Sequence, residues 1–291
     1  MSFILNLTGV TMMGFLHRQT DNILIGWRWG AGELGYYSRA YTLLMMPLNL
    51  VTGPLSSAII PAMSRLQDAP DRWRKAYLDG LIVVTLIGGA MTALLFGSSP
   101  VIIGVVFGPG WDESEKIFSL LVIAMLSATP LNTIFWIYVS TGRTNRMLHW
   151  SLMAAPFYVA SFIVGLPYGA TGVTASYGTA QIIAFVPGLW MATRGTNISM
   201  RDVFAATLPA ILSTILVGST LRYVVEHVSL PLAIIASVGA AIIHVDLMTL
   251  LVWHWQPYRR VRDRAHAMVT PILNRLGYKP TASDFPRTLS T

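Results

Sequence analysis

The sequence predicts an all-α polytopic membrane protein with eight transmembrane helices. Of its 291 residues, 54% are hydrophobic and only 11% are charged, which is less than half of the charged share usual in soluble domains. The apolar residues form long runs, and most of these runs reach or exceed the roughly 20 residues that a membrane-crossing helix needs. The Lys and Arg residues are concentrated between alternate runs, as expected if they lie on one side of a membrane.

The first four runs follow one another closely. The first two, residues 2–26 and 36–63, carry charged residues: Arg18 and Asp21 in the first, and Arg39 near the start of the second. The third run is residues 77–96. The glycine, serines and proline that follow it interrupt the pattern, and residues 101–107 are too short to cross a membrane, so they are predicted as an interfacial turn. The fourth run is residues 117–141.

The second half of the sequence supplies four more spans. Residues 147–193 contain no Asp, Glu, Lys or Arg and are too long for one helix. Glycines and a proline in residues 165–169 favour a turn there, so this segment is predicted to hold the fifth and sixth spans. Residues 203–221 and 230–253 are predicted as the seventh and eighth.

Basic residues predict the orientation of these spans. With eight spans both termini lie on one side, and fifteen of the 20 Lys and Arg residues fall on that side, with three on the other. The positive-inside rule therefore predicts that both termini are cytoplasmic. The basic segment at residues 259–264 directly follows the last span, so we expect it to contact anionic membrane lipids rather than nucleic acid. Aromatic residues gather at the expected outer ends: Trp27, Trp29, Tyr36, Tyr37 and Trp111.

Charged residues inside the first span indicate a functional site, because charge within a membrane is costly. Arg18 and Asp21 are three residues apart, so their side chains can meet on adjacent helical turns. Counted from Trp27 at 1.5 Å per residue, Arg18 lies about 13 Å inside the outer boundary, near the middle of the membrane.

Two interpretations of this segment stay open. Arg18 and Asp21 can form a structural ion pair that locks two helices together. Alternatively, Arg18 binds an anionic group of a substrate, since a guanidinium group donates two parallel hydrogen bonds to phosphate, while Asp21 orients that group or exchanges a proton. Together with Arg18 and Asp21, Asn22 and Gln19 form a polar stripe along this helix. The stripe must face other helices or a water-filled cavity.

Three other charged positions are weaker candidates. Arg39 either extends outward to the membrane surface or faces the same cavity as Arg18. His244 and Asp246 in the eighth span are a candidate proton relay, although a helix contact explains them equally well. The charged residues between 112 and 116 are predicted as a solvated outer loop.

The sequence carries no motif of a known catalytic centre. It has no Gly-rich phosphate loop, no His-Glu-x-x-His metal motif and no cysteine, so thiol catalysis and Cys-ligated zinc are excluded. We therefore expect no enzymatic activity, no cofactor and no metal. Seven prolines within or beside the spans favour bent helices of the kind found around transporter cavities.

Three segments carry a family resemblance. Residues 18–26 read RQTDNILIG, residues 32–41 read GELGYYSRAY and residues 168–177 read YGATGVTASY. These segments resemble the polysaccharide-biosynthesis flippases, which are Wzx-type oligosaccharide exporters in the superfamily of multidrug and oligosaccharidyl-lipid exporters. The resemblance is good over residues 1–200.

The resemblance implies a bacterial inner-membrane flippase. Such proteins move an oligosaccharide linked to polyprenyl pyrophosphate from the cytoplasmic to the periplasmic leaflet, through a cavity between two bundles of six helices. By this resemblance, residues 1–193 are the second bundle, residues 194–256 are two additional C-terminal spans, and residues 257–291 are a cytoplasmic basic tail. The substrate would then contact a set of polar residues: Arg18, Asp21, Asn22, Gln19 and Arg39.

The sequence departs from the family because the first bundle is missing. We expect that a separate N-terminal half supplies it, that polysaccharide assembly proteins are partners, or that the chain is an inactive truncated fragment. Competing functions are a drug extruder of the same superfamily, a membrane-embedded polysaccharide polymerase or ligase, and a non-catalytic scaffold. The large outer loop usual in polymerases and ligases is missing from the predicted topology.

Overall fold

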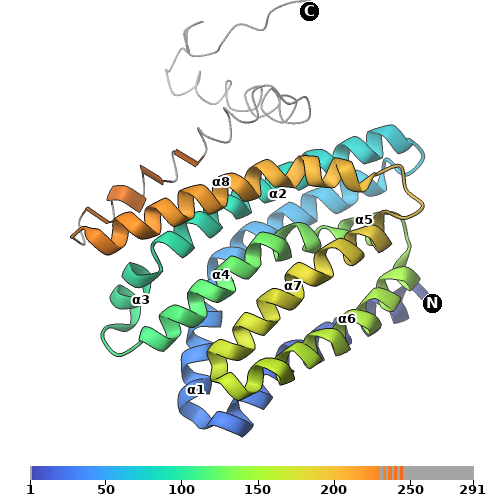
Figure 1. The fold of residues 1–291 in the computed structure, drawn as a ribbon. Helices are drawn as coiled ribbons and strands as arrows, with labels where there is room; N and C mark the ends of the chain where they lie inside the picture. Colours follow the sequence, from blue (N-terminus) through green and yellow to red (C-terminus); the bar gives the residue numbers. More distant parts are fainter. Residues whose placement is uncertain (1, 230–231, 234, 238, 241–242, 245–291) are drawn as a thin grey trace, which may run out of the picture.

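The computed structural model describes residues 2–229, 232–233, 235–237, 239–240 and 243–244, without the side chains of residues 2, 3, 18, 50 and 51. Every regular element in these residues is helical (Figure 1), so the all-α fold class is confirmed for them. The helices are α1 (Ser2–Ser64), α2 (Pro70–Gly97), α3 (Ser99–Phe107), α4 (Asp112–Asn132), α5 (Ile134–Ser140), α6 (Thr144–Gly165), the 3-10 turn η1 (Leu166–Tyr168), α7 (Gly169–Thr193) and α8 (Met200–His227).

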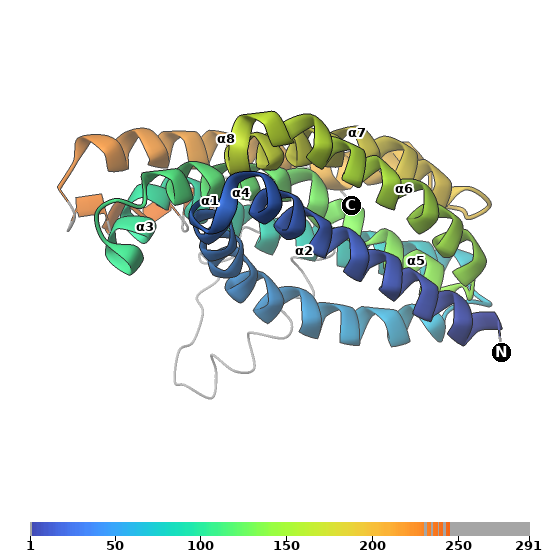
Figure 2. The ribbon, with the colours of Figure 1, turned by 90° about the horizontal axis from the view of Figure 1, so that it is seen from below.

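Helix α1 consists of two arms that meet at Gly30. This residue has φ 83° and ψ −174°, a conformation that glycine adopts readily because it has no Cβ. Figure 2 shows the first arm (residues 2–29) and the second arm (residues 31–64) running in opposite directions from the turn. The first arm follows α6, with Asn6 bonded to Asn145 at its start and the Trp29 indole donating to the Leu166 carbonyl, at 2.7 Å, at its end.

The predicted spans can now be placed on these helices. Within the described residues, four helical stretches could cross a membrane by length and composition, or up to five if the pair Ile4–Asn49 and Thr52–Ser64, bent by 43°, is counted as one span. That pair reverses direction at Gly30, and residues 144–193 fold back at η1, beyond which α7 runs beside α6 (Figure 1). They hold the first, second, fifth and sixth predicted spans. The eighth, residues 230–253, lies mostly outside the described residues, so a count of eight stays a prediction.

Helix α8 packs along α2 through small residues (Figure 1). A Cβ atom added to Gly97 would lie 2.6 Å from Leu221, and one added to Gly89 would lie 2.5 Å from Thr214. Such close approach of helix backbones is typical of membrane proteins, where small residues allow many van der Waals contacts. Replacing either glycine with a larger residue therefore has to move α8.

The start of α8 is fixed to α2 by one carboxylate. Ser199 and Asp202 form a capping box, in which Asp202 Oδ2 accepts from the Ser199 amide at 2.9 Å and Ser199 Oγ accepts from the Asp202 amide at 3.2 Å. Asp202 also pairs with Arg74 of α2, with Arg74 Nη2 at 2.6 Å from Oδ1. A single side chain thus begins the helix and joins it to its neighbour.

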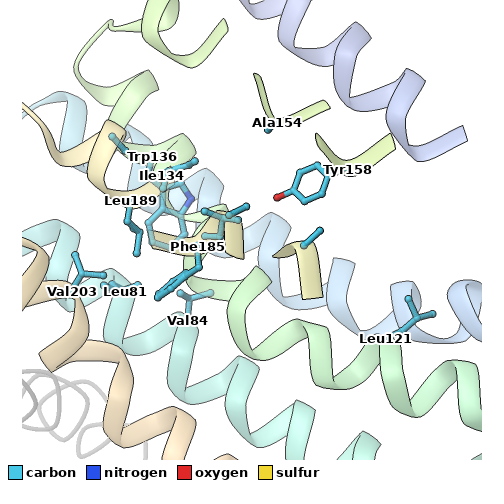
Figure 3. Packing of buried hydrophobic residues seen from close by; sticks show 14 of the residues in the cluster. Leu81, Val84, Leu121, Ile134, Trp136, Ala154, Tyr158, Phe185, Leu189 and Val203 are labelled. Atoms are coloured by element: carbon cyan, nitrogen blue, oxygen red, sulfur yellow. The ribbon is translucent and has the colours of Figure 1, made fainter. Parts of the chain in front are cut away.

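The buried core takes side chains from all of the helices α1 to α8, and Figure 3 shows part of it. Phe185 and Leu189 of α7 point toward Leu81 and Val84 of α2 and toward Trp136 of α5. The Trp136 indole donates to Ser56 Oγ at 3.0 Å, which connects this core to the second arm of α1. The core therefore holds one side of the second arm and leaves its other side open.

Candidate functional site

A buried carboxylate joins the two arms of α1 close to their turn. Asp21 of the first arm is only 5% exposed. The Tyr37 hydroxyl of the second arm donates to Asp21 Oδ2 at 2.6 Å, and the backbone N–H of Asn22 donates to Asp21 Oδ1 at 2.7 Å. Because a buried carboxylate without partners is costly, these hydrogen bonds hold the arms in one register.

Polar side chains of α6 and α7 continue this buried network. The Tyr158 hydroxyl donates to Gln181 Oε1 at 2.8 Å, and Gln181 Nε2 donates to the Tyr177 hydroxyl at 2.9 Å. The ring of His17, one turn before Asp21, stacks on Tyr158 with centroids 5.2 Å apart. We call Asp21, Tyr37, His17, Tyr158, Gln181 and Tyr177 the Asp21 cluster.

The structure separates the predicted site residues. Asp21 is buried, Asn22 is half-buried, and Gln19 and Arg39 are exposed. The side chain of Arg18 lies outside the described residues, so its ion pair with Asp21 and its contact with a substrate stay predictions.

The candidate proton relay is only partly described. His244 is buried, with Nδ1 at 3.5 Å from Ser213 Oγ of α8. Asp246 lies outside the described residues, so the relay stays a prediction.

The exposed side of the second arm carries polar side chains at intervals along its length, with the apolar Met46 and the small Gly53 between them. The exposed residues recur every three or four positions and therefore share one face of the helix. We call this surface the polar face of the second arm; its residues are Arg39, Thr42, Met46, Asn49, Gly53 and Ser57. Lipid tails offer these groups no hydrogen bonds, so the polar face indicates water or protein opposite it.

The arms bring Arg39 and Gln19 to a similar depth. The second arm begins directly after Gly30 rather than at residue 36, so Arg39 lies about 13 Å along the helix from the turn at 1.5 Å per residue. The contact between Tyr37 and Asp21 aligns the antiparallel arms. In that register Gln19, two residues before Asp21, pairs in depth with Arg39, two residues after Tyr37.

Comparison with known proteins gives this arrangement a context. Residues 1–116, which include both arms of α1, match the family model described as polysaccharide biosynthesis protein. The resemblance to the polysaccharide-biosynthesis exporters is confirmed. The chain is 29% identical over 140 residues to the amylovoran biosynthesis protein AmsL of Erwinia amylovora, covering 48% of this chain and 36% of AmsL. It is 22% identical over 225 residues to the lipopolysaccharide biosynthesis protein WzxC of Escherichia coli, covering 74% of this chain and 46% of WzxC.

The fold of this chain is also found in the solved structure of a flippase. The lipid II flippase MurJ, in an inward closed conformation, superposes with a TM-score of 0.67 at 14% identity, over 84% of this chain and 53% of MurJ. Together with the apolar helices, these similarities identify a membrane protein. The chain spans less than half the length of both curated relatives named above.

A small cavity of this protein lies beside the buried side of the second arm. It has a volume of about 30 Å³. Most of its lining side chains carry a hydroxyl or amide group: Thr52, Ser56, Thr129, Asn132 and Thr133, with Leu48, Val84 and Trp136. Polar side chains of the second arm therefore lie on its exposed face and also on part of the side that packs against the bundle.

One prediction about charge was wrong. Residues 112–116 are not a solvated loop but the first turn of α4. Glu115 is half-buried there and accepts from Arg222 Nη1 of α8 at 2.5 Å, while Ser99 and Ser119 also donate to it. The error has a physical reason: Arg222 is 107 positions away in the sequence, so no local pattern pairs the two charges.

The uncharged members of the Asp21 cluster were not predicted from the sequence. Tyr158, Tyr177 and Gln181 are neutral, so they do not stand out within apolar runs as a charged residue does. A signal was present, because Tyr177 and Gln181 are four residues apart, on one face of a helix that carries no charge. Tyr37 was interpreted only as an aromatic residue at the membrane boundary.

Proposed function

We propose that the chain is the second half of a flippase that moves a polyprenyl-pyrophosphate-linked oligosaccharide from the cytoplasmic to the periplasmic leaflet of a bacterial inner membrane. The single observation that carries this proposal is the polar face of the second arm, which runs along a helix of membrane-crossing length. A polar lane of this kind suits a sugar chain, whose hydroxyl groups need hydrogen-bond partners while they cross the membrane. Relatives named for lipopolysaccharide and amylovoran biosynthesis support the substrate class.

Within this proposal the parts of both arms that lie about two to three turns from Gly30 bind the headgroup. Arg18 binds the pyrophosphate through a bidentate guanidinium contact, and Gln19, Asn22 and Arg39 supply further hydrogen bonds to phosphate or sugar. Asp21 does not contact the substrate directly in this proposal, because both of its carboxylate oxygens accept hydrogen bonds within α1. It fixes the relative position of the arms that present the other groups.

Transport by this half requires a second half. Carriers of this type alternate their access by rocking one bundle against another around a central site. The polar face is the surface that we assign to the cavity between the halves, and a separate N-terminal half or other polysaccharide assembly proteins would close it. We assign both termini to the cytoplasm, because the arginine-rich connections lie at that end of the bundle.

The test is polymer export in the bacterium that makes this protein, after deletion of its gene and restoration with variants. We expect Arg18→Ala to reduce the polymer at the cell surface at least about tenfold, because a lost charge-assisted hydrogen bond is worth about 1.5–3 kcal/mol, and to leave lipid-linked oligosaccharide on the cytoplasmic leaflet. Arg28→Ala is the matched control, since Arg28 is exposed on the same arm and lies over the Trp29 ring beside the turn. Full export by Arg18→Ala at normal protein levels would remove this residue from the mechanism.

The same experiment separates the competing functions. A polymerase or ligase defect would leave single lipid-linked units on the periplasmic leaflet, not the cytoplasmic one. A drug extruder would change resistance to toxic compounds and leave polymer export intact. The structure gives the enzyme class no support, because in the described residues the connections at the Gly30 end are short: Gly30 itself, residues 108–111 and η1.

A further inference from the structure

A second polar cavity lies at the opposite end of the bundle from Gly30, away from the polar face. Three connections meet there: residues 65–69 between α1 and α2, residues 141–143 between α5 and α6, and residues 194–199 between α7 and α8. The cavity has a volume of about 390 Å³, which is large enough for a small polar group with its water. Its lining side chains include Gln67, Asp68, Trp73, Thr141, Arg143 and Asn197.

Two guanidinium groups converge at the edge of this cavity. Arg143 donates from Nη2 to the Gly195 carbonyl at 2.7 Å and from Nη1 to the Arg194 carbonyl at 3.3 Å. Arg146 donates from Nη1 to the same Arg194 carbonyl at 2.6 Å. Because both Nη1 atoms lie within 3.3 Å of one oxygen atom, the two positive groups are close neighbours.

No carboxylate in the described part of the chain forms an ion pair with either guanidinium group, although Asp68 lines the same cavity. The four ion pairs found there involve Arg74, Lys116 and Arg222, and none involves Arg143 or Arg146. Each guanidinium group has five N–H donors, and the contacts with the Arg194 and Gly195 carbonyls occupy only some of them. Two adjacent cations with free donors, beside a cavity lined by polar side chains, favour an anion between them.

We propose that this cavity binds a phosphate group, held by Arg143 and Arg146. Arg194 adds positive charge at the same edge, and its guanidinium lies 5.1 Å from the centre of the Trp190 ring. The cavity lies at the end of the bundle that carries the arginine-rich connections, where basic pockets of membrane proteins bind anionic lipid headgroups. The phosphate group comes either from such a headgroup or from a soluble phosphate compound.

The experiment uses the full 291-residue chain, purified in nanodiscs of phosphatidylcholine with increasing amounts of phosphatidylglycerol. Native mass spectrometry counts the lipids retained by the protein. We expect one phosphatidylglycerol to be retained in preference to phosphatidylcholine, and the double variant Arg143→Gln, Arg146→Gln to weaken that retention at least about tenfold. The matched control is Arg65→Gln, Arg201→Gln, which removes the same charge from other arginines at the same end of the bundle.

A second arm of the experiment identifies the source of the phosphate. Inorganic pyrophosphate is added to the same nanodiscs, and its binding is measured by calorimetry. If pyrophosphate binding depends on the two arginines and phosphatidylglycerol retention does not, the phosphate comes from a soluble compound. If phosphatidylglycerol retention depends on the two arginines, and pyrophosphate either displaces the lipid or does not bind, the phosphate comes from a lipid headgroup.

Two variants guard against a purely structural effect. Asp68→Asn removes the carboxylate that lines the cavity, so phosphate binding should become about threefold tighter; a role in folding alone predicts no gain. Arg143→Lys, Arg146→Lys keeps the charge and should retain part of the binding. If the Gln variant lowers thermal stability but retains phosphatidylglycerol and binds pyrophosphate as the wild type does, the arginines only hold the connection between α7 and α8, and the proposal is overturned.

Discussion

The exposed faces of α8 and of the second arm of α1 differ in a way that composition alone does not show. Helix α8 exposes bulky apolar side chains along its length, among them Leu208, Leu212 and Leu216. The second arm exposes Arg39, Thr42, Asn49 and Ser57 along a comparable length, with Met46 as an exposed apolar side chain among them. Both helices bury one side against the bundle, so the contrast is confined to the sides that face outward.

This contrast indicates that the two faces meet different surroundings. Exposed leucines suit hydrocarbon, whereas an arginine and an asparagine within a span normally face a cavity or another protein. The side chains that a membrane helix exposes therefore indicate its surroundings better than the side chains that it buries.

The largest expected effect comes from placing the same charge on both faces. Leu212→Arg puts a guanidinium in the middle of α8, where insertion into lipid costs about 3 kcal/mol. Asn49→Arg puts it in the middle of the second arm, where water or a partner protein accommodates it. We expect a large loss of membrane-inserted, detergent-extractable protein for Leu212→Arg. For Asn49→Arg we expect little loss of this protein, because the free-energy cost of insertion should stay below about 1 kcal/mol. Equal losses would show that both faces meet lipid.

A smaller effect is expected on the buried side of the second arm. Tyr37→Phe removes the hydroxyl that donates to Asp21, leaving a buried carboxylate with one hydrogen bond fewer. We expect the free energy of unfolding in detergent to fall by about 2 kcal/mol. Tyr36→Phe is the control, because Tyr36 is only half-buried and contacts the edge of Trp111 through its ring. A similar loss in both variants would contradict the role given to the Asp21 contact.

Water access distinguishes the faces directly. The sequence contains no cysteine, so a single introduced cysteine is the sole site for a water-soluble maleimide. We expect Ser57→Cys to react at least about tenfold faster than Leu212→Cys, because reaction requires the hydrated thiolate. Measured in membranes, equal rates at the two positions would remove the case for a hydrated polar face.

The smallest effect is expected from removing a hydroxyl on the polar face itself. Thr42→Val keeps the shape of an exposed side chain, so its effect on stability should stay within about 0.5 kcal/mol. A thermal unfolding curve checks this value. A loss above about 1 kcal/mol would mean that Thr42 packs against a structural partner.

Sequence patterns predicted the fold better than the site. The long apolar runs located the helices, and the glycine-rich turn at residues 165–169 was placed correctly, because both signals are local. The single-residue reversal at Gly30 was missed, since the polar residues between the first two runs suggested a longer connection. Helices α2 and α4 begin 7 and 5 residues earlier than the apolar runs, because their polar first turns are helical outside the apolar region.

The candidate site was only partly predictable for a related reason. Asp21 and Arg39 stood out because charge is rare in apolar segments. The partner of Asp21 did not, because Tyr37 lies on another arm and its hydroxyl becomes relevant only when the chain reverses at Gly30. The pairing of Glu115 with Arg222, and the convergence of Arg143 and Arg146 on one carbonyl, likewise depend on tertiary packing that no spacing encodes.

The double role of Asp202 decides how α8 is seated. Smooth apolar helices can slide past one another in lipid with little change in energy, since each side chain that leaves one groove settles into the next. Asp202 prevents this, because a shift of α8 by one turn along α2 would separate it from Arg74, and the same carboxylate could no longer serve both the first turn and the neighbouring helix. Asp202 thereby fixes α8 against α2 at the first turn of the helix, while Glu115 holds Arg222 near its other end.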